Sequence, residues 1–293
     1  MKKIFILLFM TLTLPGFSQS PATPARILLG SCTKDSLLQS PFATWFSPGY
    51  GAYHPNSAAA ATLSRKNFSG ISISLYFGSW CGDSRREVPR FLKLLDSISF
   101  PSAQLSLFAV GSSDSLYKQT PSHDEAGKGI FRVPTIVIYR NGVEMNRITE
   151  YPVYSLEKDL LQILNGADYT SNYHSFPTIR QWMTNGAFED SNISARSLAA
   201  QLAGVVTDEH ELNSLGYVLL KQGRKKEALK IFQVNYALFP GSSNIASSLG
   251  EGYYENGDYK KAVALLEQSI ELNKDPALVN DLLTLWYKAK QKE

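Results

Sequence analysis

The sequence has few residues that bind metals and almost no net charge. Its 293 residues include two cysteines and four histidines, and Lys plus Arg exceed Asp plus Glu by three. The histidines are scattered without the ligand spacing of a zinc site: His54, His123, His174 and His210. A near-neutral chain gives no support for binding to nucleic acid or to a membrane surface. We therefore expect no metal site and no nucleic-acid partner.

Cofactor motifs and long apolar runs are also scarce. No glycine-rich phosphate loop and no G-x-S-x-G elbow occurs, so we expect no bound cofactor. The one marked apolar run, residues 4–14, follows two lysines and precedes small residues. This pattern predicts a secretory signal peptide over residues 1–18, cleaved before Gln19 and too short to span a bilayer. We expect an exported protein, periplasmic or extracellular, without an integral membrane segment after cleavage; an uncleaved anchor is the alternative.

The most informative stretch is residues 71–89. A β-prone run over 71–77 ends at Gly78, and a helical pattern of apolar positions begins after Gly82. Cys81 therefore lies at a strand-to-helix turn, where unpaired amides and the helix dipole favour negative charge. Both effects stabilise the thiolate, which is the reactive form of cysteine.

Residues 80–84 read W-C-G-D-S, and Pro89 follows five residues later. Together with the strand before them, these residues resemble the thioredoxin superfamily, whose active site is W-C-x-x-C at such a turn. Two positions depart from that pattern. Ser84 replaces the second cysteine, and Leu75 stands where thioredoxin proper keeps a buried acid.

The resemblance implies an α/β fold over residues 69–166: a thioredoxin-like domain with a central mixed sheet flanked by helices. The residues themselves favour strands at 71–77, 104–110, 135–140 and 143–148, and helices at 82–98 and 155–164. Asn141-Gly142 predicts a type I′ hairpin between the last two strands. Residues 111–129 are mostly polar, and we expect them to form a loop.

The last third of the chain, residues 193–293, contains a 34-residue repeat. Four positions and their equivalents 34 residues later are Leu215 and Leu249, Gly216 and Gly250, Ala228 and Ala262, and Phe232 and Leu266. This period resembles the tetratricopeptide repeat and implies an all-α domain with two repeats, about 209–242 and 243–276. Two repeats leave apolar faces uncovered, so we expect capping helices at 194–203 and 276–290. An ordinary helical bundle is the alternative.

Two segments connect or extend these domains. Residues 19–68 are expected to form an N-terminal extension that packs on the thioredoxin-like domain, with Trp45 and Phe46 in its core and a turn at residues 48–51. Residues 167–192 are expected to form a connector with one short helix around 177–183.

The candidate catalytic residues are Cys81 and Ser84. A Cys81 thiolate would attack a substrate disulfide and form a mixed disulfide. Ser84 could donate a hydrogen bond to the thiolate, but it cannot expel the product, because a hydroxyl forms no S–S bond. The resemblance implies a cis proline at Pro134 beside the cysteine and a backbone at Val133 that an extended substrate can join. The candidate substrate groove comprises Trp80, Gly82, Asp83, Val133 and Pro134.

Cys32 has two interpretations: a small buried residue, or a resolving or disulfide partner of Cys81. The sequence thus predicts monothiol thiol-disulfide exchange with protein or small-molecule thiols and disulfides, and a protein partner bound through the repeats. One alternative is a non-catalytic adaptor or chaperone-like binding module. The other is a purely structural Cys32–Cys81 disulfide.

Overall fold

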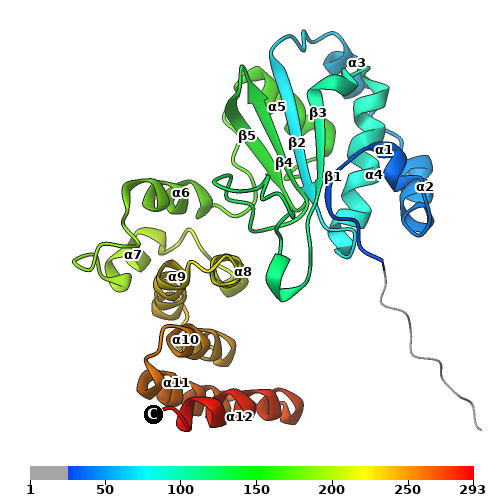
Figure 1. Ribbon diagram of the computed structural model, residues 1–293. Helices are drawn as coiled ribbons and strands as arrows, with labels where there is room; N and C mark the ends of the chain where they lie inside the picture. The colour runs from blue at the N-terminus through cyan, green and yellow to red at the C-terminus, as the bar shows by residue number, and fades with distance from the viewer. Residues whose placement is uncertain (1–25) are drawn as a thin grey trace, which may run out of the picture.

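The computed structural model describes residues 26–293, and the predicted signal peptide lies outside them. A sheet domain is followed by a column of helices (Figure 1). The strands are β1 (Gly30–Cys32), β2 (Ile71–Phe77), β3 (Leu105–Ala109), β4 (Thr135–Arg140) and β5 (Val143–Thr149). Within residues 26–293, no helix has the length and apolar character needed to cross a bilayer.

The sheet is mixed, in the order β1-β3-β2-β4-β5. β2 is parallel to β3 and antiparallel to β4, while β1 and β5 run antiparallel to their neighbours at the two edges. The β4–β5 turn has positive φ at both Asn141 (52°) and Gly142 (80°). Those angles suit the type I′ turn that the Asn-Gly pair predicts.

Five helices of this region cover one face of the sheet. They are α1 (Lys34–Leu37), α2 (Ala43–Ala52), α3 (Ser57–Ser64), α4 (Gly82–Ser97) and α5 (Leu156–Asn165). Alternate residues of β2, from Ile71 to Phe77, share one buried core with these helices. On the opposite face, Tyr76 and Val137 pack with Ile130 and Val133 of the loop that precedes β4. A loop, residues 111–133, therefore covers that face, with one 3-10 turn at Asp114–Leu116.

The N-terminal extension differs from its sequence prediction in two ways. It contributes β1 as an edge strand, and α2 continues through residues 48–51, where the sequence predicts a turn. The helix persists because Phe46 is fully buried and Gly49 lies against Pro89 of α4. A Cβ at Gly49 would lie 2.8 Å from Cγ of Pro89. Packing between α2 and α4 thus outweighs the local turn preference of Pro-Gly.

Seven helices follow the sheet domain and stack as a column (Figure 1). They are α6 (Phe176–Asn185), α7 (Ala195–Leu202), α8 (Glu209–Lys221), α9 (Lys225–Leu238), α10 (Ser243–Glu255), α11 (Tyr259–Leu272) and α12 (Pro276–Lys290). α8 packs on α9 and α10 packs on α11, while α9 and α10 join the two pairs. α7 packs on α9, and α12 packs on α11. The two helix pairs and both flanking helices occupy the predicted positions.

The α8–α9 pair approaches closely at Gly216. A Cβ there would lie 2.3 Å from Cε1 of Phe232, and the ring of Phe232 is fully buried. The equivalent position in the next pair, Gly250, would place a Cβ 3.0 Å from Cγ of Leu266. The small residues of the 34-residue repeat therefore allow close helix packing.

Replacing Gly216→Ala should lower the free energy of unfolding by about 1–3 kcal/mol, because the buried ring has no space to move. Gly241→Ala is the matched control, since a Cβ there meets nothing within 4 Å. It should change the free energy by less than about 0.5 kcal/mol. Urea unfolding followed by helical circular dichroism measures both; equal effects at the two positions would contradict the close approach at Gly216.

Candidate functional site

Cys81 is the N-cap residue of α4, directly after the β2 strand and its Gly78 turn. Its backbone is extended, and its carbonyl accepts the first helical hydrogen bond, from Arg85 N at 3.0 Å. The free amides of the first turn of α4 therefore lie beside the sulfur. The side chain is partly exposed, and its Sγ donates to the carbonyl oxygen of Val133 at 3.3 Å. The turn thus brings Cys81 against the segment that leads into β4.

Val133 and Pro134 lie next to the sulfur and form a firmly held backbone edge. The Val133–Pro134 peptide bond is cis, as the resemblance implies. The Val133 side chain is buried in the cluster under the loop, and the Pro134 carbonyl accepts a hydrogen bond from Glu150 N at 2.6 Å. The structure therefore places these two predicted groove residues beside Cys81.

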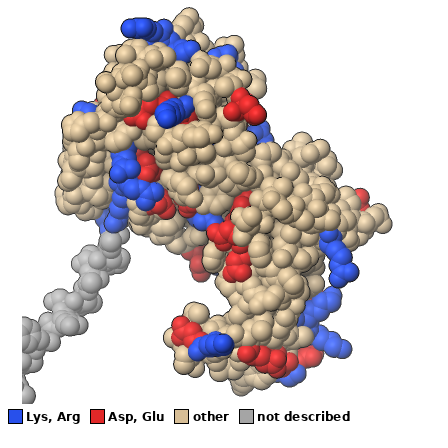
Figure 2. Space-filling view, turned by 180° about the vertical axis from the view of Figure 1, so that it is seen from behind, with Lys and Arg blue, Asp and Glu red and all other residues tan. Residues whose placement is uncertain are grey.

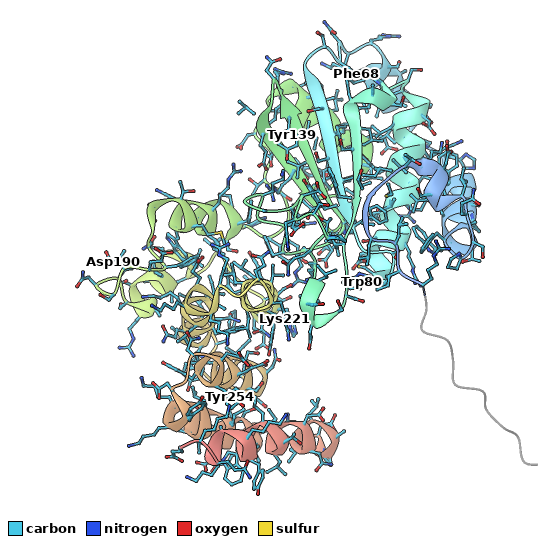
Figure 3. All side chains as sticks on the ribbon, viewed as in Figure 1. Phe68, Trp80, Tyr139, Asp190, Lys221 and Tyr254 are labelled. Atoms are coloured by element: carbon cyan, nitrogen blue, oxygen red, sulfur yellow. The ribbon has the colours of Figure 1, made fainter. Side chains whose placement is uncertain are left out.

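Trp80 forms a half-buried wall next to the cysteine. Its indole Nε1 donates to the Val110 carbonyl at 3.0 Å, and its ring stacks on Tyr117 at 6.4 Å between centroids. The indole also covers Gly78, where a Cβ would lie 2.7 Å from the ring. Figure 3 labels Trp80 at the end of the sheet that faces the helical column.

Ser84 supports the turn instead of contacting the sulfur. Its side chain is fully buried, and its Oγ accepts a hydrogen bond from Gly78 N at 3.1 Å. Within residues 26–293 the thiol of Cys81 bonds to Val133 and not to this hydroxyl. The structure therefore differs from the expectation of a Ser84–thiolate hydrogen bond. Ser84 ties the end of β2 to the first turn of α4.

The remaining motif residues form the outer rim of the site. Gly82 is exposed, and Asp83 is paired with Arg86 at 2.8 Å. Arg86 also contacts Glu87 at 2.6 Å, while Arg85 donates through Nε to the Ser79 carbonyl. Asp83 and Arg86 therefore form an ion pair at the rim of the site.

Three charged residues near the sulfur escape sequence analysis: Lys118, Arg132 and Glu150. Arg132 pairs with Glu150 at 3.4 Å, and the Lys118 Nζ donates to the Phe131 carbonyl and to Ser214 Oγ, both at 2.8 Å. Burial lowers the pKa of Lys118 to about 8 and raises the pKa of Glu150 above its ordinary value. No sequence motif identifies these three residues, because they lie close to Cys81 only in the folded chain.

The helical column packs directly on the segment beside Cys81. Ser214 Oγ of α8 donates to the Phe131 carbonyl at 3.1 Å, and Arg132 donates to the His210 carbonyl at 2.6 Å. The Phe131 ring stacks on Phe176 of α6, at 5.4 Å between centroids, inside the helical core. Residues 131–134 therefore contact the helices on one side and the cysteine on the other.

Cys32 lies apart from Cys81. It is on β1 opposite Leu107 of β3, which in turn is opposite Leu75 of β2. Cys32 packs on the helix-covered core, whereas Cys81 packs on the loop-covered cluster. Both cysteines are free thiols. The structure therefore does not contain the Cys32–Cys81 disulfide that was one of the alternatives. Burial raises the pKa of the Cys32 thiol to about 12.

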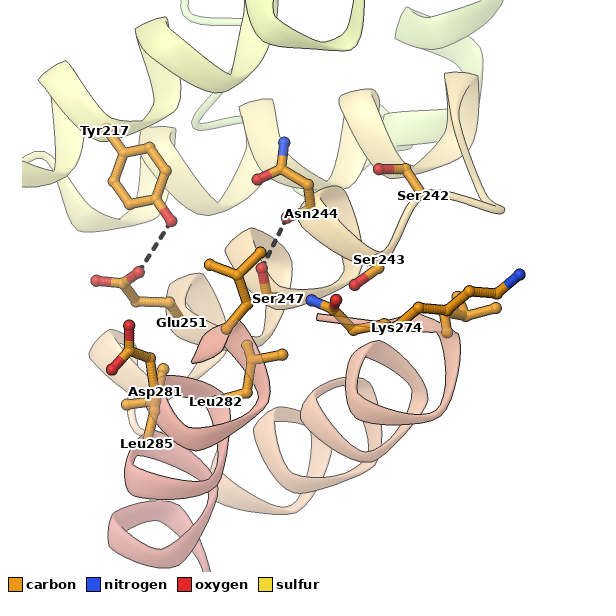
Figure 4. Close-up of a pocket in the computed structure, with 13 residues that line it drawn as sticks. Tyr217, Ser242, Ser243, Asn244, Ser247, Glu251, Lys274, Asp281, Leu282 and Leu285 are labelled. Carbon is orange, nitrogen blue, oxygen red and sulfur yellow. Dashed lines mark hydrogen bonds between the residues drawn. The ribbon is translucent and has the colours of Figure 1, made fainter. Parts of the chain in front are cut away.

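A groove lies between α10 and α12 of the helical column, apart from Cys81 (Figure 4). It encloses about 660 Å³, and its principal lining residues are Tyr217, Asn244, Glu251, Leu278, Leu282 and Leu285. The Tyr217 hydroxyl donates to Glu251 at 3.0 Å, and burial raises the pKa of Glu251. The groove thus has a polar wall on α8 and α10, and a wall on α12 that is apolar apart from Asp281. On the face shown in Figure 2, acidic and basic side chains are interspersed over both domains.

Comparison with known families identifies the helical column. Residues 219–285 match the family model described as Tetratricopeptide repeat. The column contains tetratricopeptide repeats. The match runs from the end of α8 into α12 and covers α9, α10 and α11 in full. No curated protein matches the chain.

Native Cys32 should react with iodoacetamide at pH 7.5 about a thousandfold more slowly than an unperturbed thiol. Raising its pKa from 9.0 to about 12 lowers the thiolate fraction by roughly that factor. The thiol keeps its proton below that pKa, so the rate should rise about tenfold per pH unit up to about pH 11.

Peptide mass spectrometry after timed alkylation measures the Cys32 rate, and a urea-unfolded sample is the control. Unfolding should remove the difference from an ordinary thiol. A native rate equal to the unfolded rate would contradict the buried placement of Cys32 on β1.

Proposed function

We propose that residues 69–166 form a thioredoxin-like domain that performs monothiol thiol-disulfide exchange through Cys81. The proposal depends chiefly on the Cys81 thiol, which is partly exposed at the start of α4 and lies 3.3 Å from the Val133 carbonyl. The order of strands and helices in the mixed sheet supports the fold. From the sequence of residues 1–18 we also propose export to a periplasmic or extracellular space.

The proposed reaction has two exchange steps. The Cys81 thiolate attacks one sulfur of a substrate disulfide, forms a mixed disulfide and releases the second substrate sulfur as a thiolate, which takes up a proton. An external thiol, from a small molecule or another protein, then attacks the mixed disulfide. This step restores the Cys81 thiolate and leaves the external thiol joined to the substrate. Ser84 is buried against Gly78 and takes no part in either exchange.

The repeats indicate a protein-interaction module. We propose that a protein partner binds the groove between α10 and α12, where a polar and an apolar wall face one another. A bound partner would lie on the same column whose α8 helix contacts the segment beside Cys81.

A non-catalytic adaptor is the second candidate function, and the repeat match favours it. In that case both domains bind proteins, and the Cys81 sulfur takes no part in chemistry. The two candidates differ in whether Cys81 forms a mixed disulfide.

Incubation with glutathione disulfide near neutral pH should add one glutathionyl group to the wild-type protein. Cys81→Ser should add none, because it removes the attacking sulfur. Cys32→Ser is the matched control and should keep the adduct, since the Cys32 thiol is buried. The adduct should persist until a reducing thiol is added, because no second cysteine lies in the motif.

Intact mass under non-reducing conditions measures the adduct. If Cys81 in the folded protein gains no glutathionyl group while the unfolded chain does, the exchange proposal fails. Partner binding that is unchanged in Cys81→Ser would then support the adaptor.

A further inference from the structure

Lys118 is a buried cation that forms no ion pair with a carboxylate among residues 26–293. Only 6% of its surface is exposed, and its Nζ donates to two neutral oxygens, the Phe131 carbonyl and Ser214 Oγ. Burying an ammonium without a counter-ion is unfavourable. Burying the Lys118 ammonium therefore costs free energy of folding, and the fold itself does not require a charged group at this position.

The backbone holds Lys118 firmly in this place. Its φ is +54°, a left-handed conformation that side-chain-bearing residues rarely adopt. Two backbone hydrogen bonds fix it: Lys118 N to the Gly111 carbonyl and Gly111 N to the Gln119 carbonyl, both at 2.9 Å. Such conformations persist where the surroundings impose them, and they gather at functional sites.

Most of the other charged groups around Cys81 are paired with a group of opposite charge. On α4, Asp83 is paired with Arg86; on the β4 side, Arg132 is paired with Glu150. Arg85 is exposed and binds a backbone carbonyl, and burial raises the pKa of Tyr117. From α8 come the His210 carbonyl, the Ser214 hydroxyl and Lys221, which is paired with Asp114 at 3.1 Å. Lys118 is therefore the buried cation of this set that no carboxylate pairs.

We propose that the Lys118 ammonium stabilises the Cys81 thiolate, and that Ser214 of the repeat domain holds the ammonium in place. This proposal rests on the proposed exchange function of Cys81. It makes α8 part of the thiol site. The two groups bind carbonyls two residues apart on one segment: Lys118 Nζ binds Phe131 at 2.8 Å, and the Cys81 thiol binds Val133 at 3.3 Å. A negative charge on Cys81 acts in turn to raise the pKa of Lys118.

The pH dependence has a defined sign. Below its pKa of about 8, Lys118 is charged and favours the thiolate; above it, Lys118 becomes neutral and this effect is lost. The contribution of Lys118 should therefore be largest near pH 7 and should vanish in alkaline solution.

The test measures the rate at which iodoacetamide modifies Cys81 in the full chain between about pH 5.5 and 10. Lys118→Met removes the charge and keeps an unbranched side chain. Its rate at pH 7 should be about five- to tenfold below wild type, and the two rates should converge above about pH 9.5. Ser214→Ala should lower the rate in the same pH range by a smaller factor.

Lys128→Met is the matched control, because Lys128 lies in the same loop and binds the Asp124 carbonyl. It should leave the Cys81 profile unchanged. Lys118→Arg keeps the charge and should recover most of the wild-type rate at pH 7. Recovery by Arg distinguishes a charge effect from disrupted folding, and circular dichroism of each variant checks the fold.

A Lys118→Met profile that superposes on wild type overturns this inference and leaves the exchange proposal intact. Equal losses in Lys118→Met and Lys118→Arg also overturn it, because only the packing of the side chain would then matter. A wild-type Cys81 that forms no adduct with glutathione disulfide overturns the exchange proposal and this inference with it.

Discussion

The backbone carbonyl of Phe131 is the point on which the arrangement of the two domains depends. It accepts hydrogen bonds from Lys118 Nζ of the sheet domain and from Ser214 Oγ of the repeat domain. Two residues later, the Val133 carbonyl accepts the hydrogen bond of the Cys81 thiol. One short segment, residues 131–134, thus joins the helical column to the Cys81 sulfur, and a displacement of α8 must act on both.

The interface combines an apolar anchor with buried hydrogen bonds to charged groups. The Phe131 ring packs within the helical core, while the buried Glu211 carboxylate of α8 accepts hydrogen bonds from the amide and hydroxyl of Ser175. Hydrogen bonds to charged groups are strong in a region of low dielectric, and a mispaired partner there is costly. Such an interface favours one fixed orientation of the domains. The environment of Cys81 is consequently set by residues from both of them.

The sequence predicted the elements that carry local signals. The predicted strand at 71–77 has the bounds of β2, the Asn-Gly pair marks the hairpin, and the 34-residue period places the helix pairs. It did not predict β1, which is three residues long, or α2, whose course through Pro48 depends on packing against Pro89. Within the site, the motif located Cys81 and Trp80. Lys118 could not be found, because its role depends on contacts with the repeat domain that no local pattern encodes.

The shared segment at residues 131–134 limits how this architecture can be recombined. A repeat array is commonly viewed as a module that can be appended to another domain, since each repeat contacts only its neighbours. Here the first helix pair also supplies the hydroxyl that holds a loop of the sheet domain. A chimera that exchanged the column for a foreign array would leave the Lys118 ammonium buried with one acceptor fewer. An exchange of domains at this boundary therefore has to keep α8 together with the sheet domain. The unit that must stay intact extends beyond the sheet into the first repeat.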